Sequence, residues 1–187
     1  MNTTTNSNTE LSIPNGTTDA DRAVADDARQ RERIRRALGR ASFGMLATSS
    51  PAGFPHAAGV ALDGVADDER VCIYVHMMRT SRKARNIAAD GRVAMTVPVR
   101  KLPIGPPFTI QFQGRAELVD MDSSEIAVLL ERGELDHISG HGALDEPDGV
   151  FARVVPTGRV HTYGIGVSAL ALARDPLHVG ARSIERL

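Results

Sequence analysis

Short stretches in which apolar and polar residues alternate, or in which a few apolar residues stand together, fill the middle of the chain. Such stretches are typical of β-strands, because successive side chains of a strand point to opposite faces. Turn-forming residues separate them, notably at residues 50–53 and 63–68. Strands of this length and spacing favour an antiparallel barrel or sandwich. The pattern predicts strands over residues 43–49, 56–63, 71–76, 92–97, 108–119 and 151–163.

Three other segments have the spacing or the capping residues of helices. In the first, apolar side chains recur on one face, and Thr18 or Asp19 is suited to cap its start. In the third, Asp122 followed by Glu125 resembles a capping box ahead of an apolar run. The helices are expected over residues 19–39, 81–89 and 123–132.

The length and the local composition predict a disordered N-terminal tail, one folded domain and a C-terminal extension. A chain of 187 residues suits one domain with a proper core. Residues 1–18 are rich in Asn, Thr and Ser, which predicts a disordered tail, and the folded body spans residues 19–164. Residues 133–149 are polar and Gly-rich, which predicts a loop. Residues 165–187 form a C-terminal extension whose apolar run at 167–173 can pack on the body or on a partner subunit.

Charge and composition narrow the possible partners. The net charge is −1 with 24% charged residues, so no overall basic field attracts nucleic acid. No apolar run is long enough for a membrane span, and the N-terminus lacks the features of a signal peptide, so we expect a cytoplasmic protein with a small-molecule partner. The single cysteine, Cys72, lies in an apolar strand and is expected to be a small buried residue without chemistry.

The sequence Ser81-Arg82-Lys83 begins the short helix between two predicted strands. Backbone N–H groups at a helix start, together with a hydroxyl and cations, form a site for a phosphate dianion. Lys83 is one of two lysines in the chain, and its compact ammonium suits a point contact with phosphate. Arg85 lies on the far side of such a helix and is as well placed to pair with an acidic surface residue. The alternative is a solvated basic turn.

The predicted strand before this region has unusually small side chains, over residues 57–62. Its Gly59 weakens a strand unless a ligand or another backbone comes close, as a planar ring stacked on the strand would. A tightly packed barrel interior is the alternative explanation.

In its order of segments, from residue 40 to residue 163, the chain resembles the pyridoxamine 5'-phosphate oxidase-like family of flavin-binding split β-barrels. The matching segments are the first hairpin, the Ser-Arg-Lys helix start and the strand at 108–119. The resemblance implies a mainly β fold: a split antiparallel Greek-key β-barrel with a few peripheral helices, the flavin-binding barrel spanning residues 19–164. It also implies a homodimer with the cofactor at the two-fold interface.

The resemblance assigns cofactor contacts to the chain. The Ser-Arg-Lys helix start holds the flavin phosphate in this family, and the first hairpin lies along the isoalloxazine ring. The cofactor-binding residues expected on this basis are Ala58, Gly59, Val60, Val75, His76, Ser81, Arg82, Lys83, Asn86 and Thr109.

The sequence departs from the pyridoxamine phosphate oxidases themselves. They carry an Arg and a Lys at the ends of the first flavin-contacting strand, where this chain has Ala58 and Asp63. Their C-terminal Arg-x-His-x-Arg motif is replaced here by the segment 159–163. The Lys-x-Arg-Asn of the deazaflavin-dependent reductase branch is matched by Lys83, Arg85 and Asn86. The cofactor is therefore contested: FMN is the one expected from the family, and the deazaflavin coenzyme F-420 is the alternative.

Two other motifs suggest a metal site and a dinucleotide-binding site, and neither is expected here. His137 and His141 have helix-like spacing, but the neighbouring glycines disfavour a helix and no third ligand is evident, so no metal site is expected. Residues 164–169 superficially resemble a dinucleotide fingerprint, but too few residues follow to form the βαβ unit that the motif requires.

These observations predict an oxidoreductase that transfers a hydride between a flavin or deazaflavin and a small organic substrate, with no catalytic side chain required. The alternative is a cofactor-binding or storage protein without turnover, including a haem-binding one. Histidine ligation by His56, His76 or His161 distinguishes the haem case. A structural dimeric barrel with an empty site is the third possibility.

Overall fold

A computed structural model describes residues 18–66, 70–99, 108–140 and 142–187. Its centre is one antiparallel sheet with the strand order β2-β1-β5-β6-β7-β4-β3, and β8 pairs with β7. The predicted disordered tail lies outside the described residues except for Thr18. The strands are β1 (Phe43–Ser49), β2 (Pro55–Ala61), β3 (Asp63–Ala66), β4 (Val71–Met78), β5 (Arg92–Val99), β6 (Phe108–Asp120), β7 (Gly149–Tyr163) and β8 (Ala181–Ile184).

The long strand β7 joins the two halves of the sheet. Its first half pairs with β4, from Val150 opposite Met77 to Val154 opposite Ile73. Its second half pairs with β8, and β6 follows it along nearly its whole length, with a register shift at Phe112/Gln113. This bulge and the strand twist curl the sheet into a half-barrel.

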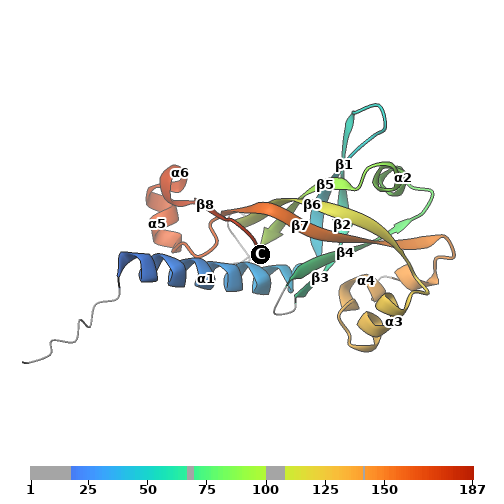
Figure 1. The fold of residues 1–187 in the computed structure, drawn as a ribbon, viewed down its shortest axis with the longest axis horizontal. Coiled ribbons are helices and arrows are strands. Elements are labelled where there is room, and N and C mark those ends of the chain that lie inside the picture. The colour runs from blue at the N-terminus through green and yellow to red at the C-terminus, as the bar shows by residue number, and fades with distance from the viewer. Residues whose placement is uncertain (1–17, 67–69, 100–107, 141) are drawn as a thin grey trace, which may run out of the picture.

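The helices lie at the margins of the sheet (Figure 1). Helix α1 extends to one side, α2 lies near β1 and β5, and α3 and α4 lie together near the ends of β4 and β7. They are α1 (Asp19–Leu38), α2 (Arg82–Ala89), α3 (Ser124–Glu131), α4 (Asp136–Ser139), the 3-10 turn Ala143–Asp145, α5 (Ala169–Arg174) and α6 (Pro176–Val179).

The apolar core lies inside the curl of the sheet. Ile34 and Leu38 of α1 are fully buried there together with side chains of β1, β4, β5, β6 and β7. Ile165 and Ile184 belong to the same core, so part of the C-terminal extension packs on its own chain. A smaller apolar cluster lies beneath α3 and α4 and includes Phe151.

Most predicted elements are confirmed within two residues of their ends. Strand β1 has the predicted bounds, because its side chains alternate between exposed and buried. Thr18 caps α1 in a capping box with Asp21. In α3, however, the cap is Ser123, whose hydroxyl accepts from the Ile126 N–H, and the expectation for Asp122 was wrong.

Two segments differ from the prediction. The supposed turn at Asp63–Gly64 begins β3, and the loop expected over 133–149 contains α4 and a 3-10 turn. The two segments are in contact: the buried Asp63 carboxylate accepts hydrogen bonds from the N–H groups of His137 and Ile138, at 3.3 and 2.9 Å. This contact joins β3 to the start of α4 across 74 residues of sequence.

The segment after β7 has no dinucleotide-binding geometry. Gly164 and Gly166 have φ of +75° and +78°, which turns the chain sharply at the end of β7. The next strand, β8, returns antiparallel to β7. A βαβ unit requires parallel strands, so the glycines at residues 164 and 166 do not form a dinucleotide-binding motif.

Candidate functional site

The turn between β4 and α2 positions the start of the predicted phosphate-binding helix. Arg79 pairs with the Asp120 carboxylate. The hydroxyl and N–H of Thr80 donate to Asp148 at 2.9 and 3.3 Å. Ser81 then caps α2, since its hydroxyl accepts from the Ala84 N–H at 3.3 Å. The turn is therefore held by contacts to β6 and to the segment before β7 that sequence reasoning did not find.

The inner face of α2 fixes its orientation on the sheet. Ala84, Asn86 and Ile87 are buried, and the Asn86 side-chain amide donates to the Thr48 hydroxyl of β1 at 2.9 Å. Asn86 was expected to bind cofactor; here its amide connects α2 to β1. Successive residues of a helix point in directions about 100° apart. With Ala84 and Asn86 facing the sheet, Arg82 is exposed and Lys83 is half-buried.

The first turn of α2 carries positive charge without a compensating acid. It has no acidic residue, and neither Arg82 nor Lys83 pairs with a carboxylate of the described residues. As the first helical positions, their backbone N–H groups have no intrahelical acceptor. Arg85 donates to the Thr80 carbonyl at 2.6 Å instead of pairing with an acid. The helix start therefore presents N–H groups and two cations suited to an anion.

His76 lies on β4 next to this helix start. Its side chain is half-buried, and Nε2 has no hydrogen-bond partner among the described residues. Its ring packs edge-on against Phe151, with centroids 5.5 Å apart. Burial lowers the pKa of His76; Glu146 opposes the shift and the positive charge of Lys83 adds to it. The structure thus brings His76 and Lys83 into one electrostatic environment.

The preceding residue, Val75, points the other way. It is fully buried in the core, as the alternation along a strand requires. Its side chain is therefore not available to a ligand, and any contact must come from its backbone.

The three residues expected on the first hairpin do not share a face. Val60 is buried and Ala58 half-buried, whereas Gly59 faces outward. A side chain at Gly59 would crowd the Phe43 ring, since a Cβ there would lie 3.1 Å from it. Around Gly59 the outer face of the hairpin is apolar, and Phe43 and Met45 are 50% and 41% exposed.

Thr109 lies far from α2 within one chain. It stands at the start of β6, opposite Pro98 and Tyr163. The Ala116 N–H, seven residues later on β6, donates to Gly91 just after α2. Seven strand residues span roughly 24 Å. The expected contact residues thus form a group at the start of α2, with His76 beside it, and a separate Thr109.

The histidines do not converge on one point. His56, His76 and His161 lie on β2, β4 and β7, opposite Thr48, Phe151 and Gln111 respectively. Within the described ranges, no three His, Cys, Asp or Glu side chains gather as a metal site would require. His137 bonds to Asp63 through Nδ1 at 2.6 Å, and His141 lies outside the described residues.

A search for membrane-spanning helices was negative. Among the helices that the structure describes, none is both long and apolar enough to cross a membrane.

Comparison with protein families gives one match that covers most of the chain. The sequence profile of the pyridoxamine 5'-phosphate oxidase family matches residues 30–148. This range contains β1 to β6 and the start of α2. A search of curated protein sequences finds no match.

Solved structures share the fold. The haem storage protein HutZ from Vibrio cholerae superposes with a TM-score of 0.59 at 20% identity, covering 73% of this chain and 96% of that one. A haem-binding protein from Mycobacterium smegmatis gives 0.62 at 19% identity, with 83% and 57% covered. An FAD-binding protein from Mesorhizobium loti gives 0.51 at 21% identity, with 67% and 87% covered. The expectation of a mainly antiparallel split β-barrel with a few helices is confirmed.

Proposed function

The chain belongs to the pyridoxamine 5'-phosphate oxidase family, and from this membership we propose that it is an FMN-dependent oxidoreductase. The deazaflavin coenzyme F-420 is the alternative cofactor, supported by the match of Lys83, Arg85 and Asn86 to the deazaflavin branch. The substrate class is a small organic molecule that exchanges a hydride with the cofactor ring.

The start of α2 is the observation that carries this proposal. Cations at a helix N-terminus oppose the helix macrodipole, which favours anions there. Arg82 and Lys83 therefore destabilise the free helix slightly, and a bound phosphate offsets that cost while accepting from the open N–H groups. The donor set fits a phosphate group, which FMN carries as a monoester and coenzyme F-420 as a diester.

The roles of the chain's own residues follow from this placement. When bound, the cofactor supplies hydride transfer, and the protein supplies binding and orientation. Ser81 and Asp148 hold the helix start, while Arg82 and Lys83 bind the phosphate. Asn86 fixes the distance between this phosphate site and β1 through Thr48. Burial lowers the pKa of His76, the Glu146 carboxylate opposes that shift, and the positive charge of Lys83 adds to it, so the His76 ring favours its neutral form beside the proposed phosphate site.

We propose further that the protein is a homodimer whose two copies share each cofactor. The separation of Thr109 from α2 within one chain supports this arrangement, because the contact that the family resemblance assigns to Thr109 would then come from the second copy. The outer face around Gly59, with exposed Phe43 and Met45, offers an apolar surface for the second copy. Light scattering at micromolar concentration should give twice the chain mass. A monomer that still binds FMN would contradict the shared site.

The phosphate site is tested by comparing FMN with riboflavin, which has the same ring but no phosphate. Lys83→Ala should weaken FMN binding by about tenfold to a hundredfold, because a charge-assisted contact to phosphate is lost. Riboflavin should bind the variant and the wild type equally. Arg92→Ala is the matched control, because Arg92 lies just beyond α2 and is already paired with Asp90 at 2.7 Å. Equal loss for both ligands, or no loss, would refute the phosphate site.

The alternative is a cofactor-binding protein without turnover. A haem version of it requires an axial ligand; His76 is a candidate whose Nε2 has no hydrogen-bond partner among the described residues, although that atom is buried against Gly149. The visible absorption spectrum of the purified protein separates flavin, deazaflavin and haem. A Soret band that His76→Ala abolishes would replace the flavin proposal.

A further inference from the structure

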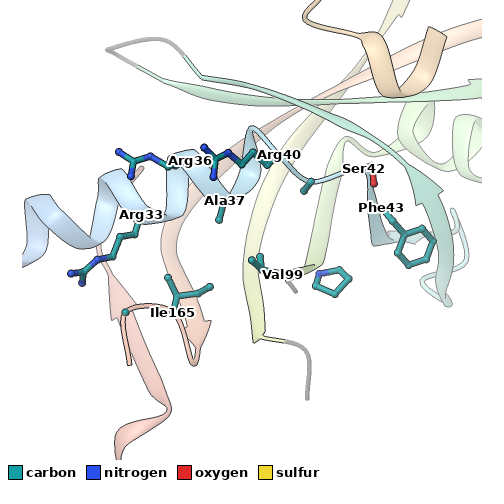
Figure 2. A pocket seen from close by; sticks show the side chains of 11 residues that line it. Arg33, Arg36, Ala37, Arg40, Ser42, Phe43, Val99 and Ile165 are labelled. Carbon is teal, nitrogen blue, oxygen red and sulfur yellow. The ribbon is translucent and has the colours of Figure 1, made fainter. Parts of the chain in front are cut away.

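An open cavity of about 940 Å³ lies between the C-terminal half of α1 and the sheet, away from the start of α2, and only its Phe43 end adjoins the apolar face proposed for the second copy. Residues of α1, of the segment leading into β1, of the end of β5 and of the turn after β7 line it. Figure 2 shows Ala37 of α1 pointing toward Ile165 across the cavity, with Val99 and Phe43 further along. Its volume is in the range of small-molecule sites.

The interior of this cavity is apolar. Ala37, Phe43, Val99 and Ile165 line it, and Phe43 is half exposed at one end. Ligand sites of this volume are lined mostly by apolar side chains with a few polar groups. Water alone gains little from such a lining, so the interior favours an apolar ligand group.

The rim along α1 is positively charged. Arg33 and Arg36 of α1 and Arg40, two residues beyond its end, border the cavity, and in Figure 2 their guanidinium groups extend outward along α1 rather than toward Val99. Arg36 pairs with Glu32 at 2.9 Å. Arg33 and Arg40 form no ion pair with any described residue.

Arg33 and Arg40 differ in their ion pairing from arginines nearer the start of α1. Arg22, Arg29 and Arg31 each have an aspartate three or four residues earlier as partner. Basic residues near a helix C-terminus also favour the macrodipole, which accounts for their presence without a ligand. It does not account for an apolar cavity beneath two unpaired guanidinium groups. The Arg33 guanidinium also packs close to Gly166, where a side chain would crowd it, since a Cβ there would lie 2.8 Å from Nη1.

We propose that this cavity binds an amphipathic organic anion, with its apolar body against Ala37, Val99 and Ile165 and its terminal carboxylate or phosphate at Arg33 or Arg40. The two arginines are seven residues apart, one on α1 and one just beyond its end, so one small anion contacts one of them while the other adds long-range attraction. Charge complementarity at the rim and apolar lining inside together select this class of ligand.

The cavity is distinct from the phosphate site on α2. Phe43 begins β1 and borders the cavity, whereas Thr48, five residues later on the strand, contacts Asn86 of α2. Five strand residues span roughly 17 Å. Loss of one site should therefore leave the other intact, and the two proposals can fail separately.

Calorimetric titration of the full chain with decanoate, decyl phosphate and 1-decanol tests the proposal. We expect saturable binding of at least one of the two anions and much weaker binding of the alcohol. Whichever anion binds more tightly identifies the headgroup. The double variant R33Q/R40Q should lower the affinity for that anion by about tenfold, a discounted value because both guanidinium groups are exposed.

Two further variants make the test specific. Ala37→Leu should remove binding of the anion by filling the cavity, while FMN binding stays unchanged. R22Q/R29Q removes the same charge from the same helix outside the cavity and should bind like the wild type. Absence of saturable binding of both anions, equal binding of the alcohol, or equal weakening by R33Q/R40Q and R22Q/R29Q would each overturn the proposal.

Discussion

Helices α1 and α2 begin in opposite ways. Helix α1 starts with a capping box, carries Asp19 and Asp21 in its first turn and ends with Arg35 and Arg36. Each of these charges favours the helix macrodipole. One apolar face of α1 is also buried in the core, so its caps, its charges and its packing all stabilise the fold.

Helix α2 keeps the cap and reverses the charges. Ser81 caps it as Thr18 caps α1, but its first turn has Arg82 and Lys83 and no acid, and its C-cap is Asp90. The hydrogen bonds from Arg92 lower the pKa of Asp90 to about 2, so this carboxylate stays ionised at the unfavourable end. The cap of α2 is well formed while the charges of its first turn oppose the macrodipole, and such a conflict between local rules is expected at a functional site.

The largest expected effect is a loss of stability, without a loss of FMN affinity, when the buried face of α1 is damaged. Leu38→Ala removes a fully buried side chain of α1, and the cavity it leaves should lower the free energy of unfolding by about 2–5 kcal/mol. Urea denaturation measures it. FMN affinity of the folded fraction should not change. A parallel loss of affinity would show that α1 also shapes the phosphate site.

The next effect should have opposite signs for stability and binding. Arg82→Glu places an acid at the N-terminus of α2, so the ligand-free protein should gain about 0.5–1 kcal/mol of stability. The same change should weaken FMN binding by about a hundredfold, because attraction of the phosphate becomes repulsion. Urea denaturation without ligand and titration with FMN measure the two quantities.

The mirror-image change on α1 is the control for that experiment. Asp19→Arg should lower stability by a similar amount and leave FMN binding as in the wild type. If Arg82→Glu destabilised the ligand-free protein instead, the cations of α2 would have a structural role and the comparison of the helices would fail.

What the sequence predicts well is what short-range patterns encode. Alternation gave the bounds of β1, and the capping residues gave the starts of α1 and α2, because these signals lie within a few residues of the structure they determine. The basic start of α2 was visible for the same reason. The lack of carboxylate partners for Arg82 and Lys83 among the described residues was not predicted, because it depends on which side chains of other segments approach them.

What the sequence did not predict depends on contacts between distant segments. Asp63 reads as a turn residue, and only its hydrogen bonds to His137 and Ile138 explain a buried carboxylate at the start of a strand. The charged rim above the cavity was missed likewise. Arg33 and Arg40 read as ordinary helix residues, and Ile165, which completes the apolar lining, lies 125 residues beyond Arg40. No local pattern connects such positions.

The smallest expected effect concerns the titration of His76. Because burial lowers its pKa, the folded protein resists a proton that the unfolded chain accepts near pH 6.5. The stability that this residue contributes is therefore complete above about pH 6.5 and declines as the pH falls toward the lower pKa of the folded state.

His76→Gln should flatten the dependence of the unfolding free energy on pH over that interval, and urea denaturation at about pH 7.5 and about pH 5.5 measures the difference. A saturating anion at α2 should reduce the slope in the wild type, because it offsets the Lys83 charge that helps to lower the His76 pKa. Inorganic phosphate is a sufficient probe, and Lys83→Ala should make the slope insensitive to it. If phosphate left the pH dependence of the unfolding free energy unchanged in the wild type, no anion would bind beside His76. The two helices would then differ in their contribution to stability and not in ligand binding.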